Sequence, residues 1–239
     1  MSITRREFAK SALAAALWSC GVGVSLPALA ADGRAIVYNA PAEWAGWGAM
    51  LQLIKKETGI SVPVDNKNSG QSVSQILAEQ KNPVADACYL GVSFAINAKN
   101  QGLVENYKGE GWNRVPDGLK DPDGAWVSIH AGTIGLMVNV EALDGLPVPK
   151  SWNDLLDPKY EGLVGFLDPS SAFVGYACAM AVNQAMGGSL DNFQPALDYF
   201  KKLRDNSPIV PKQTAYARCL SGEIPILFDY DFAAYRAKH

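Results

Sequence analysis

Along residues 34 to 100, two kinds of spacing between apolar residues alternate. Short apolar runs of strand length are separated by stretches in which apolar residues recur every three or four positions, as they do on one face of a helix. In the clearest stretch, residues 44–58, Trp47 and Leu51 fall on one face and Gly59 follows as a stop signal. The predicted strands cover residues 34–39, 60–64 and 85–90, and the predicted helices cover 44–58 and 73–77.

The second half of the chain repeats this pattern after a loop. Residues 104–125 are rich in Gly, Pro, Asp and Asn, which indicates surface loop. The pattern then predicts strands at 126–129, 133–139, 163–167 and 224–228, a short helix or turn at 155–162, and helices at 192–204 and 216–220. Ser170 and Ser171 are predicted to open a further helix, because Ser is a preferred N-cap residue. Alternating strands and helices predict an α/β fold with mainly parallel sheets.

The first 30 residues read as a targeting signal. Arg5 and Arg6 are followed by Phe8 and Lys10, then by an uncharged run that ends in a small-residue pattern at Ala30. This arrangement is typical of a twin-arginine signal peptide, and we expect cleavage after Ala30 and export to the periplasm. Loss of residues 1–30 removes a net charge of +2, so the formal charge changes from −3 to −5.

Composition narrows the class of protein. The chain is 48% hydrophobic and has no basic patch, so we expect a globular protein that does not bind nucleic acid. After the signal, Cys88, Cys178 and Cys219 remain, each in an apolar context. An odd and sparse set of cysteines predicts buried free thiols rather than disulfide bonds.

An enzyme is the weaker interpretation. The enzymatic alternative is a serine hydrolase. Its base would have to be one of two histidines, His130 or His239, and Gly91–Ala95 lacks the final glycine of a nucleophile elbow. No Walker pattern, dinucleotide fingerprint or zinc spacing is found in the sequence. We therefore predict no catalytic residue, cofactor or resident metal.

Several short motifs occur in a characteristic order. They are Val37-Tyr38-Asn39, Asn68-Ser69-Gly70, Asn82-Pro83-Val84-Ala85-Asp86, Thr133-Ile134-Gly135, the run from Ser151 to Tyr160, Asp168-Pro169-Ser170-Ser171 and Ser221-Gly222-Glu223. Together they make residues 34–239 similar to the periplasmic solute-binding proteins of ABC importers, the family that includes ferric-iron, polyamine, thiamine and phosphonate binders. The run from Trp152 to Tyr160 is the most specific of these motifs.

The resemblance implies a periplasmic binding protein type II fold. Each of two lobes is then a mainly parallel sheet flanked by helices, with the ligand cleft between the lobes. Residues 31–145 form lobe 1, in which 133–139 lies near the hinge, and 146–239 form lobe 2. The family implies capture of a small solute and its delivery to an ABC permease in the inner membrane, and we expect a monomer. Chains of this family continue well past the equivalent of residue 239, so we expect a C-terminally truncated chain.

The class of solute stays open among three alternatives. A phosphonate or phosphorylated solute would use the N–H groups and hydroxyls at Ser69–Ser72 and Ser170–Ser171, because helix starts favour anions. A polyamine would use Asp229 or Asp231 with the aromatic faces of Trp44 and Tyr230. Ferric iron is disfavoured, because Ala42 and a single tyrosine stand where iron binders of this family have a histidine and a tyrosine pair. We prefer the anion.

The candidate ligand-binding residues lie after predicted strands or at predicted helix starts, where ligands of open α/β sheets bind. They are Asn39, Trp44, Ser69, Gly70, Gln71, Ser93, Thr133, Ser170, Ser171, Asp229, Tyr230 and Asp231.

Overall fold

The structure is a computed structural model that describes residues 33–213 and 215–238. The predicted signal peptide and His239 lie outside the described residues. The helices are α2 (Trp47–Thr58), α3 (Ser69–Ala78), α4 (Val92–Asn100), α5 (Phe173–Ala185), α6 (Gln194–Leu203), α7 (Tyr216–Leu220) and α8 (Asp231–Lys238). The strands are β1 (Val37–Tyr38), β2 (Ala87–Cys88), β3 (Ile134–Val138), β4 (Val164–Gly165) and β5 (Ile226–Tyr230).

The first sheet pairs β1 with β2 in parallel, as predicted, with Val37 opposite Ala87 and Tyr38 opposite Cys88. The predicted helix after β1 is confirmed as α2, which ends at Gly59 in the left-handed conformation. Its buried side chains Trp47 and Leu51 pack with Ala40. The predicted strand at 60–64 is reduced to isolated bridges at its two ends. Only short strands form here, and helices supply most of the packing.

The second sheet has the order β3-β5-β4. β4 and β5 are parallel, whereas β3 runs antiparallel to β5 over all five of its residues. The sheet is therefore mixed, which corrects the expectation that both sheets are mainly parallel. β3, the strand expected near the hinge, thus shares a sheet with strands from beyond residue 146.

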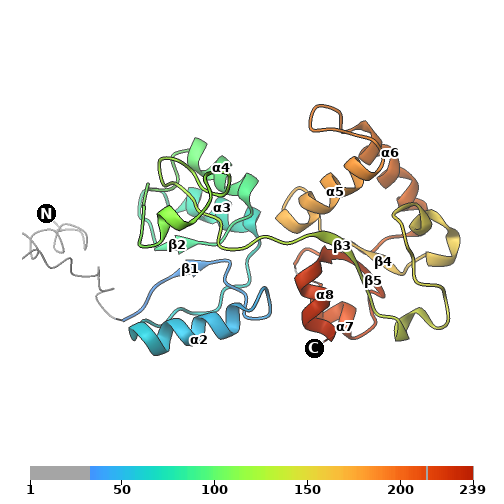
Figure 1. Cartoon of the computed structure of the whole chain (residues 1–239), viewed down its shortest axis with the longest axis horizontal. Helices are drawn as coiled ribbons and strands as arrows, with labels where there is room; N and C mark the ends of the chain where they lie inside the picture. The colour runs from blue at the N-terminus through green and yellow to red at the C-terminus, as the bar shows by residue number, and fades with distance from the viewer. Residues whose placement is uncertain (1–32, 214, 239) are drawn as a thin grey trace, which may run out of the picture. The chain divides into compact units, whose positions relative to one another are not determined.

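Both faces of β5 are buried, and its side chains alternate between two hydrophobic clusters. Ile226 and Phe228 face the cluster that includes residues of α5 and α6, and Leu227 faces the cluster that includes residues of α7 and α8. In Figure 1, α5 and α6 accordingly lie on one side of the sheet and α7 and α8 on the other. A central strand covered on both faces explains why residues 226–228 read as a continuous apolar run.

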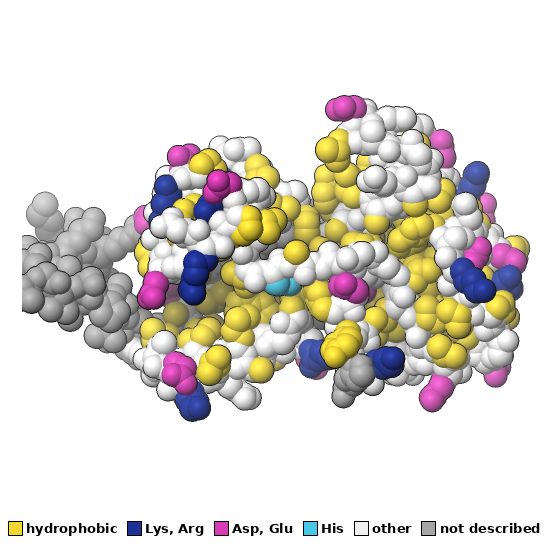
Figure 2. Space-filling view, viewed as in Figure 1, with side chains coloured by type: hydrophobic (Ala, Val, Ile, Leu, Met, Phe, Trp, Pro, Cys, Tyr) yellow, Lys and Arg dark blue, Asp and Glu magenta, His cyan; other side chains and the backbone are white. Residues whose placement is uncertain are grey.

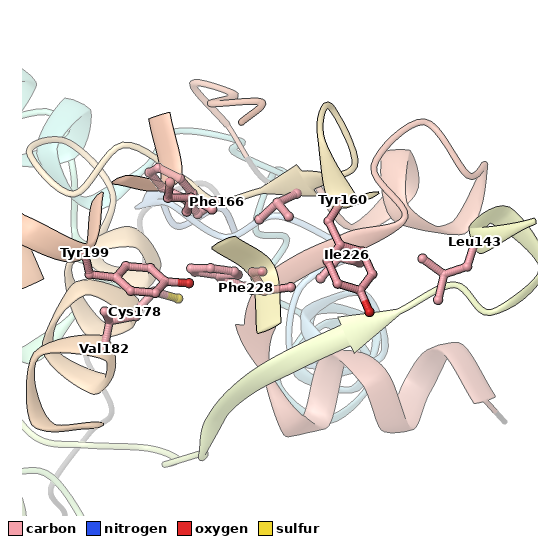
Figure 3. Packing of buried hydrophobic residues seen from close by; sticks show 11 residues of the cluster. Leu143, Tyr160, Phe166, Cys178, Val182, Tyr199, Ile226 and Phe228 are labelled. Atoms are coloured by element: carbon pink, nitrogen blue, oxygen red, sulfur yellow. The ribbon is translucent and has the colours of Figure 1, made fainter. Parts of the chain in front are cut away.

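Aromatic side chains fill the larger cluster around Phe228 (Figure 3). The ring centroid of Phe228 lies 4.8 Å from that of Trp152 and 5.6 Å from that of Phe166. The two tyrosine hydroxyls of this cluster have partners: Tyr199 donates to the carbonyl of Trp152 at 2.7 Å, and Tyr160 to that of Pro147 at 2.7 Å. The most specific motif of the sequence, Trp152 to Tyr160, therefore anchors this core.

Other elements also differ from the sequence prediction. The prediction of a strand at 126–129 is wrong. Val127 makes only an isolated bridge with Lys120, and none of the strands among the described residues includes this segment. Helix α4 was not predicted. Helix α5 begins at Phe173, with Ala172 as its N-cap, so Ser170 and Ser171 do not open it. β5 covers Ile226–Tyr230 rather than 224–228.

The described cysteines are free thiols, as predicted, with Cys178 and Cys219 buried and Cys88 half-buried. Burial raises the pKa of Cys219 to about 11. Within residues 33–213 and 215–238, no helix combines the length and hydrophobicity that crossing a bilayer requires. On the face shown in Figure 2, acidic and basic side chains are scattered singly and are not gathered into a field of one sign.

Candidate functional site

The carboxyl ends of β1 and β2 meet at Asn39 and Tyr89. Because the two strands are parallel, the residues that follow them lie at the same edge of the sheet. Asn39 is buried in the left-handed conformation, with φ 61°, and its Nδ2 donates to the carbonyl of Tyr89 at 2.6 Å. Asn39, a predicted site residue, thus fixes the backbone at the end of β2.

Five aromatic side chains gather next to this edge, and we call them the aromatic cluster: Trp44, Tyr89, His130, Tyr230 and Phe232. The ring centroid of Trp44 lies 5.9 Å from that of Tyr230 and 5.2 Å from that of Phe232, both in edge-to-face geometry. His130 stacks on Tyr89 at 5.6 Å and meets Phe232 at 5.4 Å. The cluster therefore joins side chains that are nearly 190 residues apart in the chain.

Hydrogen bonds order the same cluster. The indole Nε1–H of Trp44 donates to the hydroxyl of Tyr89 at 3.0 Å, and that hydroxyl also bonds Nε2 of His130. Desolvation lowers the pKa of His130 below its ordinary value. Within the described residues, the hydrogen bond to His130 comes from Tyr89 and not from a serine hydroxyl.

The start of α3 is closed by the protein's own groups. Asn68 and Gln71 form a reciprocal capping box, in which each side chain accepts from the other's backbone N–H. The N–H of Gly70 donates to the carbonyl of Ser171 at 2.9 Å, and the Ser69 hydroxyl accepts from Gly91 N–H at 3.1 Å. The N–H groups of Gly70 and Gln71 that were predicted to hold an anion are thus already engaged.

The starts of α4 and α5 are different, because neither has a side-chain cap. Their N-caps are Gly91 and Ala172, and the first-turn N–H groups of both helices make no hydrogen bond to any described residue. The two starts face each other closely, since a Cβ on Gly91 would lie 1.8 Å from Cγ of Phe173. Two sets of free donors and two positive helix ends therefore meet where Gly91 contacts Phe173.

The two serines before α5 have other partners. The backbone N–H and the hydroxyl of Ser170 both donate to Oδ1 of Asp168, at 2.8 and 2.7 Å. These bonds hold the pKa of the Asp168 carboxyl below its usual value. Ser171 contributes its carbonyl to Gly70. The hydroxyl of Ser170 therefore stabilises the turn and does not cap the helix.

The acidic candidates at the end of β5 lie in different surroundings. Asp229 is buried, and desolvation raises its pKa to about 7, although the N–H of Tyr230 donates to its carboxylate at 2.7 Å. Asp231 is exposed, and its Oδ1 accepts from the N–H of Thr133 at 3.1 Å. In the described part of the chain, no group of three His, Cys, Asp or Glu residues is arranged to hold a metal ion.

The structure thus brings most of the predicted residues into two adjacent groups. Asn39, Trp44 and Tyr230 meet at the aromatic cluster, and Ser69, Gly70, Ser93 and Ser171 meet at the helix starts. Tyr89, Phe173 and Phe232 were missed by the sequence analysis. Tyr89 lies near the end of the predicted strand at 85–90, as Asn39 lies at the end of the one at 34–39, and that position is the signal that points to it.

Comparison with known proteins agrees with this architecture. Residues 82–239 match the profile of the bacterial extracellular solute-binding proteins. An uncharacterized protein of Haemophilus influenzae is 31% identical over 204 residues, which are 80% of this chain and 56% of that protein. A putative 2-aminoethylphosphonate-binding periplasmic protein of Salmonella paratyphi A is 25% identical over 152 residues, 64% of this chain and 42% of that protein.

A solved structure is also similar. The periplasmic binding protein AfuA from Actinobacillus pleuropneumoniae, with fructose-6-phosphate bound, has a TM-score of 0.72 and 26% identity, and the match covers 86% of this chain and 66% of AfuA. The chain belongs to the bacterial extracellular solute-binding proteins, and its fold is the type II fold of periplasmic binding proteins. It spans 56% and 42% of the lengths of the two sequence relatives.

Proposed function

We propose that this protein is the substrate-binding component of an ABC importer and not an enzyme. In this role it captures an anionic phosphonate or phosphorylated solute and delivers it to a membrane permease. The observation that carries this proposal is the meeting of α4 and α5 at Gly91 and Phe173 with their first-turn N–H groups free. Unsatisfied helix N-termini hold anions through their N–H groups and the positive end of the helix dipole.

The geometry favours α4 and α5 over α3 as the anion site. The N–H groups of Gly70 and Gln71 already donate to protein oxygens, whereas those of Val92, Ser93 and Phe94 donate to no described residue. Ser93, at the second position of α4, adds a half-buried hydroxyl at the same place. The phosphate or phosphonate group would lie there, with the rest of the solute toward the aromatic cluster.

The relatives support this class of solute. One is named as a putative 2-aminoethylphosphonate-binding protein, and another is solved with fructose-6-phosphate. The polyamine alternative has less support, because Asp229 is buried and the carboxylate of Asp231 already accepts two backbone N–H groups. A solute with an anionic group is therefore the better match to the free donors.

We also propose that the protein works as a monomer in the periplasm and reaches it through a twin-arginine signal at residues 1–30. The paired Arg5 and Arg6 before an uncharged run support this route. A periplasmic location suits a protein whose relatives are named as periplasmic.

Ligand titration with Ser93→Asp tests the solute class. An aspartate in the first turn of α4 stabilises the helix but places a negative charge where the anion would bind. We expect 2-aminoethylphosphonate or fructose-6-phosphate to raise the melting temperature of the wild-type protein. Ser93→Asp should weaken that binding at least about tenfold, roughly 1.4 kcal/mol, in calorimetric titration, with its own unfolding temperature unchanged or raised.

Asn97→Asp is the matched control, because it makes the same charge change on an exposed position of the same helix, away from its start. It should bind as the wild type does. A shift with spermidine or ferric citrate, and none with either anion, would reject the anionic solute and leave the transport role intact. A Ser93→Asp protein that binds the anion as tightly as wild type would reject the α4 site.

A further inference from the structure

We propose that Tyr89 is the positioning residue of the solute site, the side chain that fixes Trp44 and His130 beside the start of α4. The proposal rests on the proposed function for the location of the site. Tyr89 lies two residues before Gly91, the N-cap of α4, and its hydroxyl bonds residues from two distant segments of the chain. Tyr89 is not among the ligand-binding residues predicted from the sequence.

The backbone of Tyr89 is held rigidly by the end of β1. Its N–H donates to the carbonyl of Tyr38 at 2.9 Å, and its carbonyl accepts from Asn39 Nδ2 at 2.6 Å. The ring packs edge-to-face on Trp47 with centroids 5.2 Å apart. Main chain and ring are therefore both fixed, which a side chain needs if it is to orient others.

The hydroxyl has a defined direction. Trp44 Nε1 can only donate, so the Tyr89 oxygen accepts from it, and the hydroxyl proton is available for donation to Nε2 of His130. In this arrangement His130 is neutral and carries its own proton on Nδ1. Burial raises the pKa of Tyr89, which keeps the hydroxyl protonated and able to donate.

The partners of Tyr89 contact the end of β5 and the start of α8. Trp44 and His130 both meet Phe232, and Trp44 also meets Tyr230. The main chain passes close to these rings, because a Cβ on Gly132 would lie 2.7 Å from Phe232 and 2.9 Å from Tyr230. One hydroxyl directly after β2 thus bonds two side chains whose rings pack on residues 230 and 232, where β5 ends and α8 begins.

Tyr89→Phe tests the assignment, because it keeps the ring and removes only the hydroxyl. Without that donor the neutral form of His130 loses a hydrogen bond, so the pKa of His130 should rise. Among the described residues, Tyr89 bonds His130, and Tyr230 and Asp231 are the titratable neighbours of Phe232, the ring that His130 meets. Proton NMR follows the His130 titration, and His130→Asn identifies its signal against that of His239.

The same variant is measured for solute affinity. The substitution removes both hydrogen bonds of the hydroxyl. A cost of about 1 kcal/mol to the ordered site should weaken binding of 2-aminoethylphosphonate or fructose-6-phosphate roughly fivefold. Tyr107→Phe is the matched control, because Tyr107 is 78% exposed and lies outside the aromatic cluster. It should change neither the His130 titration nor the affinity.

A higher pKa of His130 together with weaker solute binding in Tyr89→Phe supports the proposal. An unchanged His130 titration overturns it, even if the melting temperature falls, because a merely structural tyrosine would give that result. Wild-type affinity in Tyr89→Phe overturns it as well. If the wild-type protein binds neither anion, the proposed solute class fails, and the His130 titration still decides whether Tyr89 orders the cluster.

Discussion

Asp229 shows how burial controls the chemistry of one residue. Its carboxyl is 4% exposed at the end of β5, and the only hydrogen bond that it accepts among the described residues comes from the N–H of Tyr230. Burial disfavours the charged form, which is why its pKa is raised from 3.8 to about 7. The sequence analysis treated Asp229 as a ligand for a cation, but a carboxyl in this environment is largely neutral below neutral pH.

This burial predicts a pH-dependent stability. The folded protein holds a proton on Asp229 up to about pH 7, whereas the unfolded chain releases it near 3.8. Between these values the native state binds more protons, so the free energy of unfolding should fall as pH rises from about 4 to 7. Asp229→Asn should lack this fall and should be relatively more stable at pH 8, by roughly 2–4 kcal/mol.

Urea unfolding of both proteins at a series of pH values measures the effect. Asp191→Asn, at an exposed position, serves as the control and should follow the wild-type curve. Parallel curves for wild type and Asp229→Asn across pH 4 to 8 would mean that Asp229 is charged in the folded protein.

At the scale of elements, three helix starts that look alike in sequence have different roles. Each begins near serine or glycine, yet α3 is closed by its capping box, whereas α4 and α5 begin without a side-chain cap. The difference depends on where the orphan N–H groups point after folding. Ser93 and Ser170 therefore could not be told apart from the sequence, and only contacts showed that Ser170 is committed to Asp168.

The contact between α4 and α5 predicts a specific intolerance at Gly91. Its φ is −63°, so an alanine is not strained there, but its Cβ would overlap Phe173. Gly91→Ala should therefore lower the free energy of unfolding by about 1–3 kcal/mol through overpacking. In a protein that already carries Phe173→Ala, Gly91→Ala should cost much less, because the clashing ring is gone. Urea unfolding of the single and double variants would measure the difference.

Gly118→Ala is the control for this cycle, since a Cβ there meets nothing within 4 Å. It should leave stability within about 0.5 kcal/mol of wild type. Additive effects of Gly91→Ala and Phe173→Ala would show that the two residues do not touch in solution.

At the scale of the whole molecule, the export route can be tested in cells. Replacing Arg5 and Arg6 together by Lys should stop twin-arginine export, because that route is recognised through the arginine pair. The unaltered chain should appear in the periplasm, and its mass should be that of a chain that begins at Ala31. A control variant with Lys55 and Lys56 changed to Arg, on the surface of α2, should be exported normally. Periplasmic accumulation of the Arg5 and Arg6 variant would point to a different signal.

The sequence by itself determined the class of fold, the positions of most helices and the family. Those features depend on local periodicity and on short motifs, such as the apolar spacing of α2 and the run from Trp152 to Tyr160, which remain visible in one dimension. Three features depend on which strands lie side by side: the pairing of β3 with β5, the mixed sheet and the absence of a strand at 126–129. A local sequence pattern does not contain that information.

The site divides in the same way. The sequence pointed to Asn39, Trp44, Ser93 and Tyr230, because residues after strands and at helix starts are where ligands of this fold class bind. It could not assign Tyr89 or the free donors of α4 and α5. Those assignments depend on hydrogen bonds and ring contacts between residues far apart in the chain, and such contacts exist only once the chain has folded.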